Sequence, residues 1–347
     1  MTTHRRLLDA AVQRFAPRSE TLRDAAICIT GASGFMAASL LAFLAELSRV
    51  AELRLKLYAS ARRPAGEIHL FDFLGVVPQV EWTQSAVEDS QLPAADRLIV
   101  IHTASYGSPR DYLREPLATF SANTHGIVRL LTQDRGLRQF VYFSSAEVYG
   151  QPPSDMIPTP ESYIGGVSTV EARSIYAESK RMGEVLAVSL AQLRQVPLTI
   201  IRPWNVYGPG QRLNDGRVPI DFIRQAKEGR RITLTSNGSP QRALCHSWDA
   251  VTQIVASLGN PAARSAFNVG NPSEEISMLN LARACAAACQ LPADAVHYDR
   301  EARTEGLSRC SPNVDAVFRH GGMPPAFTPL ASGLPTLIEW YEFLHRQ

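Results

Sequence analysis

The sequence predicts a doubly wound α/β fold, in which helices cover both faces of a parallel sheet. Short apolar segments alternate with longer helical patterns: the segments at 26–30, 53–58, 97–102, 140–144 and 198–202, and the patterns at 39–47, 117–133 and 176–195. Alternating strands and helices are typical of parallel sheets, because each crossover to the next parallel strand needs a connection of helix length. The first segment also runs directly into glycines and then a helix, an order typical of dinucleotide-binding units.

Composition and charge exclude several classes of protein. The 347 residues carry a net charge of +2, and no run of Lys or Arg exceeds two residues, so we expect no nucleic-acid partner. No apolar stretch is long enough to span a bilayer, so we expect no membrane partner. The start lacks the pattern of a signal peptide and the five cysteines are an odd number, which together favour the reducing cytoplasm.

A metal site is not expected. Cys285 and Cys289 lie four residues apart and share a helix face, but no further Cys or His completes a cluster around them. Cysteines of this kind are usually small core residues.

We expect three parts along the chain. Residues 1–24 form an amphipathic helical extension, residues 25–204 form mainly the dinucleotide-binding domain, and residues 205–347 form mainly a smaller lobe that covers the substrate. The two larger parts are interleaved, because the segment 266–269 is predicted to return to the sheet as a strand.

The glycine loop predicts where a cofactor binds. Gly31, Gly34 and the small Ala37 follow the first strand and open a helix, so that backbone N–H groups and the helix N-terminus can face a pyrophosphate. We assign further residues in this loop and at the ends of neighbouring strands to the same site: Ser33, Phe35, Met36, Ser60, Thr103, Ala104 and Pro203.

The residues after the second strand bear on the choice between NAD and NADP. An acidic residue that would bind the adenosine ribose is missing there, and Arg62 and Arg63 follow instead. Arginines at this place can accommodate a 2′-phosphate, which favours NADP; they can equally be solvated loop charges.

Tyr176 and Lys180 are the predicted catalytic pair. Residues four apart on a helix share one face, and an ammonium beside a phenol favours the phenolate and lowers the tyrosine pKa. Ser145 can offer its hydroxyl to the same oxygen. This set is suited to removing a proton from an alcohol while a nicotinamide takes the hydride, and we assign Tyr176 and Lys180 to the cofactor site as well.

With these segments in place, the chain resembles the extended short-chain dehydrogenase/reductase superfamily that acts on nucleotide sugars. Within it, the chain is most similar to the UDP-glucuronate decarboxylases, or UDP-xylose synthases, across about residues 26 to 345. The shared segments are the glycine loop, the Tyr176/Lys180 pair, and the stretches 144–150, 202–210 and 267–272. The loops 104–112, 163–167, 171–173 and 214–218 narrow the match to the decarboxylases. The resemblance implies a seven-stranded Rossmann sheet with a small C-terminal lobe, NAD as cofactor and a nucleotide-sugar substrate.

The resemblance also implies a set of substrate-binding residues. Arg242 and Arg309 are expected to clamp the pyrophosphate of the substrate, for which a guanidinium fork is suited. Cys310 and Ser311 replace basic residues that the family carries after Arg309. The remaining candidates are Ser105, Tyr112, Asn123, Arg173, Asn205 and Arg217; for Asn123 a structural role is equally open.

Position 146 separates the possible reactions. The nucleotide-sugar 4,6-dehydratases carry an Asp-Glu pair where this chain has Ala146 and Glu147, so the acid that expels water is absent. Simple 4-epimerases usually lack the Glu. Glu147 without the Asp therefore favours a decarboxylase, in which Glu147 assists proton transfer at C5. A C4 or C5 epimerase, a dehydratase that uses Glu147 alone, and a non-catalytic dinucleotide sensor are the alternatives.

A homodimer is the expected assembly. The helix that carries Tyr176 continues with apolar residues on more than one face, among them Val185 and Leu193, and the helix near 118–131 offers a neighbour. Two such pairs related by a two-fold axis would form a four-helix interface. The alternative is that residues 1–24 cover this surface within one chain.

Overall fold

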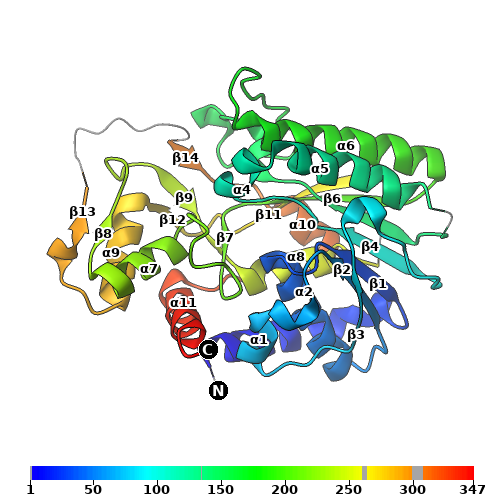
Figure 1. The fold of residues 1–347 in the computed structure, drawn as a ribbon, viewed down its shortest axis with the longest axis horizontal. Coiled ribbons are helices and arrows are strands. Elements are labelled where there is room, and N and C mark those ends of the chain that lie inside the picture. The colour runs from blue at the N-terminus through cyan, green and yellow to red at the C-terminus, as the bar shows by residue number, and fades with distance from the viewer. Residues whose placement is uncertain (1, 134, 260–263, 299–307) are drawn as a thin grey trace.

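The computed structural model describes residues 2–133, 135–259, 264–298 and 308–347, and Figure 1 shows the course of the chain. The helices are α1 (Thr3–Phe15), α2 (Phe35–Val50), α3 (His69–Leu74), α4 (Pro109–Arg114), α5 (Pro116–Leu131), α6 (Ser174–Arg194), α7 (Ile220–Gly229), α8 (Ser247–Ala256), α9 (Met278–Ala288), α10 (Asp315–Gly321) and α11 (Leu330–Leu344). The strands are β1 (Ala26–Thr30), β2 (Lys56–Ala61), β3 (Val80–Gln84), β4 (Leu98–His102), β5 (Gln139–Phe143), β6 (Leu198–Pro203), β7 (Val206–Tyr207), β8 (Ile232–Thr233), β9 (Gln241–Ala243), β10 (Cys245–His246), β11 (Arg264–Val269), β12 (Glu275–Ser277), β13 (Val296–His297) and β14 (Arg309–Cys310).

The central element is a seven-stranded parallel sheet in the order β11-β6-β5-β4-β1-β2-β3. The chain moves outward from β1 to β3 and then returns to place β4 on the other side of β1, with Thr30 in register with His102. The strand order therefore reverses between β1 and β4, and ligands of doubly wound sheets bind beyond the carboxyl ends of the strands at such a point. The predicted fold class is confirmed.

Alternate residues of the central strands enter two different cores. Ile27 and Ile29 of β1 face the core that contains α2 and α8, whereas Cys28 packs in the core that contains α5 and α6. β4 and β5 alternate in the same way. Strands buried on both faces read as continuous apolar runs, which is why they could be recognised in the sequence.

Two strands differ from the expectation. The second strand starts at Lys56 rather than at 53, because Glu52 and Arg54 adopt left-handed backbone conformations with φ of 52° and 54° and so lie in the turn before it. β3 was not among the expected strands. It lies at the sheet edge with polar, partly exposed residues and has no apolar run.

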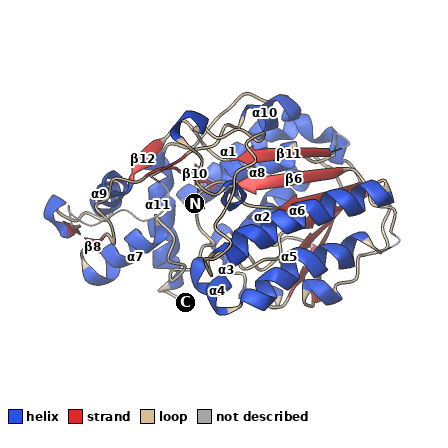
Figure 2. Cartoon of the chain, turned by 90° about the horizontal axis from the view of Figure 1, so that it is seen from above, coloured by secondary structure: helices blue, strands red, loops and turns tan. Residues whose placement is uncertain are grey.

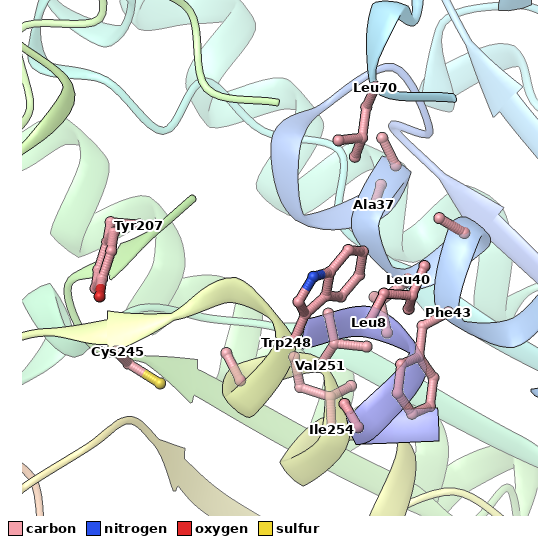
Figure 3. Packing of buried hydrophobic residues seen from close by; sticks show 14 of the residues in the cluster. Leu8, Ala37, Leu40, Phe43, Leu70, Tyr207, Cys245, Trp248, Val251 and Ile254 are labelled. Atoms are coloured by element: carbon pink, nitrogen blue, oxygen red, sulfur yellow. The ribbon is translucent and has the colours of Figure 1, made fainter. Parts of the chain in front are cut away.

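The N-terminal helix α1 packs on the α2 side of the sheet, away from α5 and α6 (Figure 1). The Arg5 guanidinium donates to the Glu46 carboxylate of α2 at 3.0 Å, and the N–H of Thr3 donates to the Glu339 carboxylate of α11. Figure 3 shows Trp248 of α8 directed toward α1 and α2. The alternative in which residues 1–24 cover the outer faces of α5 and α6 is therefore wrong.

The elements after residue 204 are shared between the lobe and the sheet. Helices α7 and α9 lie at one end of the molecule with the small strands β8 and β12, whereas β11 lies beside β6 in the main sheet (Figure 2). The lobe contains a three-stranded sheet in the order β12-β9-β14. No helix in the described part of the chain is both long and apolar enough to cross a membrane.

Asn268 of β11 connects the sheet to both parts of the chain around it. Its side-chain carbonyl accepts hydrogen bonds from the Tyr149 hydroxyl at 2.8 Å and from the Trp204 indole at 2.9 Å. Its amide group donates to the carbonyls of Thr159 and Asn313. The side chain is fully buried, so all of these bonds form away from water, where leaving a polar group unpaired costs most.

Three histidines are buried in the neutral state, and they make the fold sensitive to acid. Burial lowers the pKa of His102 and of His246 to about 3, and lowers the pKa of His4 well below its usual value. The unfolded chain takes up protons first, near pH 6.5. The free energy of unfolding is therefore expected to fall as the pH drops below about 6.5, by up to ~1.4 kcal/mol per pH unit for each histidine.

His4→Phe isolates one of these contributions. The His4 ring stacks on Trp248 at 4.7 Å, and within the described chain neither of its ring nitrogens has a hydrogen-bond partner. Phenylalanine keeps the stack and removes the titrating group, so we expect stability at pH 7 to be kept and the loss between pH 7 and pH 5 to be smaller than in the parent protein. Urea unfolding at several pH values measures both, and the exposed His69→Gln is the control. An unchanged acid dependence in His4→Phe would contradict the prediction.

Candidate active site

The predicted catalytic residues meet where β5 ends and α6 begins. Ser145 lies two residues after β5, and its hydroxyl accepts a hydrogen bond from the N–H of Glu147 at 3.1 Å. The same hydroxyl lies near enough to the phenol of Tyr176, on the first turn of α6, to favour the phenolate and lower its pKa. Tyr176 is buried. A short 3-10 turn after Ser145 places Glu147 beside this pair.

The Tyr176 ring is held by a second tyrosine. Tyr112 of α4 stacks on it with ring centroids 5.1 Å apart and an angle of 9° between the ring planes. Burial raises the pKa of the Tyr112 hydroxyl, and the positive charge of Arg173, at the start of α6, acts in the opposite direction. The stack thus fixes the ring of Tyr176 against α4.

The expected lowering of the Tyr176 pKa by Lys180 is wrong for this geometry. Burial, and then the charge of Glu147, raise the pKa of Tyr176 to about 12, and the hydrogen bond from Ser145 only partly offsets them. The Lys180 ammonium lies 5.9 Å from the centre of the Tyr176 ring and donates to the carbonyl of Phe143 at 2.5 Å. Burial lowers the pKa of Lys180 itself to about 7.

Glu147 is the half-buried carboxyl of the site. Burial raises its pKa, while the positive charges of Arg173 and Arg217 act in the opposite direction. A carboxyl whose pKa is raised by burial can hold and release a proton closer to neutral pH than an exposed one.

Asn123 is linked to the backbone of Tyr176 through the Ser179 hydroxyl. Its amide donates to the Ser179 hydroxyl at 2.9 Å, and that hydroxyl donates to the carbonyl of Tyr176 at 2.9 Å. Asn123 is fully buried. It fixes the first turns of α6, which is the structural role left open by the sequence.

The glycine loop forms a cradle between β1 and β4. Gly31 has φ +71°, and a Cβ there would lie 2.5 Å from the Cα of Ala104, so only glycine permits this approach. The next helix, α2, begins at Phe35 without a side-chain cap at Gly34. Its first N–H groups are thus suited to a phosphate.

The two arginines after β2 lie over this loop. The Arg63 guanidinium donates to the carbonyl of Ser33 at 2.8 Å. The Arg62 guanidinium hydrogen-bonds the Tyr106 hydroxyl and lies 4.7 Å from the centre of the Tyr106 ring. Arg62 is exposed and Arg63 is half-buried, and each has a hydrogen-bond partner beside the predicted cofactor site.

The other predicted cofactor residues lie at the same edge of the sheet, and they differ in what their side chains contact. The Ser60 hydroxyl is hydrogen-bonded to Ser90, and the Thr103 hydroxyl donates to the carbonyl of Thr30 at 2.7 Å. Met36 packs against the core, and Pro203 is the last residue of β6. Ser105, assigned to the substrate, has a buried hydroxyl without a hydrogen-bond partner among the described residues.

The predicted substrate arginines of the lobe differ in their partners. Arg309 forms a two-pronged ion pair with Glu275 at 2.7 and 2.9 Å, because β14 and β12 flank β9 in the small sheet. Arg217 forms an ion pair with Asp215 at 2.8 Å. Its positive charge also lowers the pKa of Glu147. Arg309 therefore already has a counter-ion in Glu275. The expectation that Arg309 binds the substrate pyrophosphate did not include this ion pair.

Arg242 and Asn205 lie at the border between the lobe and the site. Arg242 on β9 donates to the carbonyl of Gln241 and lies in register with Cys310. Asn205 donates to the carbonyl of Ala243 at 3.2 Å and to the sulfur of Cys310. Its side chain therefore links β9 and β14 to the end of β6.

Comparison with known proteins identifies the family. Residues 27–270 match the model of the NAD dependent epimerase/dehydratase family. The chain belongs to this family.

Several curated proteins that are similar to this chain in sequence are named UDP-glucuronic acid decarboxylases. The chain is 34% identical over 185 residues to UDP-glucuronic acid decarboxylase 1 of Xenopus tropicalis, which covers 53% of this chain and 43% of the relative. It is 29% identical over 274 residues to UDP-glucuronic acid decarboxylase 5 of Arabidopsis thaliana, covering 77% of each. The chain spans about half of the length of three of these relatives.

A solved structure shows the same fold. The UDP-glucuronic acid 4-epimerase from Bacillus cereus, in complex with UDP-glucuronic acid and NAD, superposes with a TM-score of 0.75 at 19% identity, covering 92% of this chain and 99% of that one. At this identity the likeness concerns the fold of the epimerase/dehydratase family alone.

Three residues beside the site were not singled out from the sequence. The Lys180 ammonium lies 5.1 Å from the centre of the Tyr142 ring, whose hydroxyl is buried without a partner among the described residues. The Ser144 hydroxyl, next to Ser145, is buried and unpartnered in the same part of the chain. The third residue is Tyr106, whose hydroxyl accepts a hydrogen bond from the Arg62 guanidinium. Tyr142 alternates with Phe143 on β5, so strand periodicity could have placed it toward α6.

A separate cavity of about 650 Å³ lies between α9 and α11. No predicted site residue lines it, and we do not assign the reaction to it. Its walls are Glu274, Ala284, Ala288, Leu330, Ala331, Leu334, Pro335, Ile338 and Glu339.

Within the epimerase/dehydratase site, Glu147→Gln is expected to lower the pKa of Tyr176. The variant removes the negative charge that opposes the phenolate, so the pKa should fall from about 12 toward the ordinary value of 10.0. NMR of ¹³C-labelled tyrosine across a pH titration measures it. Glu178→Gln is the control, because Glu178 lies on the same helix but pairs with Arg181 at the surface. A Tyr176 pKa that stays at the parent value would show that Glu147 does not act on it.

Proposed function

We propose that this protein modifies the sugar of a nucleotide sugar, and that its reaction is the decarboxylation of a UDP-uronate such as UDP-glucuronate. The observation that carries this proposal is the pair of Tyr176 and Ser145, with the half-buried Glu147 beside them and Ala146 directly before Glu147 in the sequence. The names of the curated relatives support it.

NAD is the proposed cofactor, and the glycine cradle fits it. Gly31 and Ala104 meet without room for a side chain, and α2 starts without a side-chain cap. When bound there, NAD would supply the hydride acceptor and donor that transient oxidation of C4 requires. Arg62 and Arg63 lie where they can contact the adenosine end and a 2′-phosphate, which makes NADP the second candidate.

Tyr176 is assigned the proton of the C4 hydroxyl. It removes this proton as C4 is oxidised and returns it as C4 is reduced again. Ser145 donates a hydrogen bond to the oxygen at C4, and a fixed donor of this kind in a site that excludes water can contribute a few kcal/mol. Tyr176 can accept this proton only as the phenolate, and its pKa of about 12 disfavours that form. Positive charge near the phenol lowers this pKa, and Arg217 supplies such a charge.

Glu147 is assigned to C5. A ketone at C4 makes a C5 carboxylate a β-keto acid, whose loss of CO₂ leaves an enolate. Protonation of C5 then completes the decarboxylation, and Glu147, whose pKa is raised by burial, can deliver this proton directly or through water. The alternatives use the same groups differently: a C4 epimerase needs only the proton at C4, and a dehydratase must expel water without the acid that Ala146 replaces.

The test is to incubate the purified protein with UDP-, dTDP-, GDP- and CDP-sugars and to follow the mass of each. We expect UDP-glucuronate to lose the mass of CO₂, about 44 Da. Loss of water would favour the dehydratase, and unchanged mass with altered retention the epimerase. Tyr176→Phe should slow turnover by roughly 10²–10⁴-fold. Binding of cofactor without turnover of any sugar, unaffected by Tyr176→Phe, would favour the dinucleotide sensor.

The cofactor is expected to remain bound after purification, because the hydride is returned within each cycle. Denaturing the protein and identifying the released dinucleotide should yield NAD. Release of NADP would instead assign Arg62 and Arg63 to a 2′-phosphate. A protein that is active only with a stoichiometric reductant would contradict the internal redox cycle.

We also propose that the protein is a homodimer built on α5 and α6. These helices lie side by side (Figure 1) and expose a set of large apolar side chains that no part of the described chain covers. The set, with Leu113 from the preceding helix, is Leu113, Leu117, Phe120, Val128, Met182, Val185 and Leu193.

Light scattering is expected to give a mass near twice 38.1 kDa. Val185→Glu places a charge in the middle of the apolar surface and should shift the protein toward the monomer. Val77→Glu is the matched control, because Val77 is 93% exposed but lies in the loop between α3 and β3 and is not part of α5 or α6. A parent protein that is monomeric at every concentration would refute the dimer.

A further inference from the structure

The short turn that carries Glu147 is held at its far end by a buried tyrosine. The turn runs over Ala146–Tyr149, and Tyr149 is its last residue. The Tyr149 side chain is almost fully buried. Its hydroxyl accepts a hydrogen bond from the Arg202 guanidinium at 2.8 Å and donates one to the side-chain carbonyl of Asn268 at 2.8 Å. The place of Glu147 therefore depends on what holds Tyr149.

The same guanidinium is bound to α6, the helix that carries the catalytic pair. Nε and Nη2 of Arg202 donate to the two carboxylate oxygens of Glu184 at 2.8 and 2.6 Å. Glu184 lies four residues after Lys180 and eight after Tyr176 on α6, so Lys180 and Glu184 share a helix face. Arg202 thus joins the turn after β5 to the helix that carries Tyr176.

Arg202 is itself on a fixed base. It lies on β6, which is hydrogen-bonded to β5 on one side and to β11 on the other. The side chains of the ion pair are only 13% and 14% exposed. The nitrogen that bonds Tyr149 also donates to the carbonyl of Glu161 at 3.2 Å, so all three nitrogens of the guanidinium have partners. A two-pronged pair of this kind fits in one orientation, because the guanidinium is planar and its donors are fixed in direction.

We propose that Arg202 is a positioning residue, which holds the turn carrying Ser145 and Glu147 at a set place relative to Tyr176. For its effect on catalysis, this inference rests on the proposed function. Displacing a reacting group by about 1 Å can slow a reaction by roughly 100-fold. Arg202 acts through the turn and the helix, so its loss is expected to lower kcat more than it changes KM.

Tyr149→Phe tests the contact with the turn. It keeps the ring and removes the hydroxyl between Arg202 and Asn268, while Trp204 still donates to Asn268. The amides of Glu147 and Gly150 are hydrogen-bonded within the turn, so hydrogen exchange of residues 145–150 in the full-length protein reports on its release. We expect faster exchange there, a kcat for UDP-glucuronate that is roughly 10–100-fold lower, and a KM within about twofold of the parent value.

Two further variants test Arg202 itself. Arg202→Lys keeps the positive charge opposite Glu184 without the fork, and should show a smaller effect than loss of the side chain. Arg202→Met combined with Glu184→Met removes both charges, so that neither is left buried and unpaired. This double variant should show the same local rise in exchange and the same fall in kcat as Tyr149→Phe. If the double variant does not fold, Tyr149→Phe decides.

Two controls separate positioning from general stability. Arg5→Met removes a similarly buried ion pair, that with Glu46 on the α1 and α2 side of the sheet, and should raise exchange in α1 while leaving kcat unchanged. Arg181→Gln removes the other side-chain contact from α6 to the turn, the bond from Arg181 to the carbonyl of Val148 at 2.8 Å.

The inference would be overturned by unchanged exchange of residues 145–150 in Tyr149→Phe, or by a rise shared equally by the whole chain. A rise confined to Arg181→Gln would assign the role to Arg181 instead. Faster exchange with an unchanged kcat would show that the turn can move without affecting the reaction, and would also overturn it. A parent protein that converts no nucleotide sugar would overturn the proposed function, and the exchange rates would still decide whether Arg202 holds the turn.

Discussion

The close approach of Gly31 to the backbone of Ala104 is the constraint on which the rest of the site depends. A side chain at Gly31 would push the loop after β1 away from the end of β4. With glycine, the loop closes against that strand, the N–H of Ala32 bonds the carbonyl of Ser60 at 3.1 Å, and α2 begins at a fixed place over the sheet. The core formed by α1, α2 and α8 then follows from where α2 starts.

The charges of the site are arranged around the half-buried carboxyl of Glu147. Burial disfavours the carboxylate form of Glu147, whereas the positive charges of Arg173 and Arg217 favour it. Tyr176 is in turn disfavoured as a phenolate by Glu147. Adding or removing one charge at any of these groups therefore changes the protonation of the others, so the site responds to an ionic ligand as a unit.

The sequence was sufficient for the features that depend on local pattern. Strands buried on both faces, such as β1 and β4, stand out as apolar runs, and the glycine loop and the Tyr176/Lys180 spacing are local as well. The edge strand β3 escaped because its residues are polar. The pKa of Tyr176 and the pairing of Arg309 with Glu275 could not be predicted, since both depend on burial and on contacts between distant segments.

The Asn268 hydrogen bonds have a consequence for how this protein can be divided experimentally. A fragment that ends at residue 204 would keep the glycine loop and Tyr176, yet it would lose β11 and leave β6 as a bare sheet edge, a surface that invites aggregation. It would also lose the acceptor for Tyr149, which lies in the short 3-10 turn after Ser145, and for Trp204, which follows β6. The dinucleotide-binding half is thus not an independent folding module. Swapping lobes between relatives to exchange specificity would require β11 to be kept with the sheet and only the segments on either side of it to be replaced.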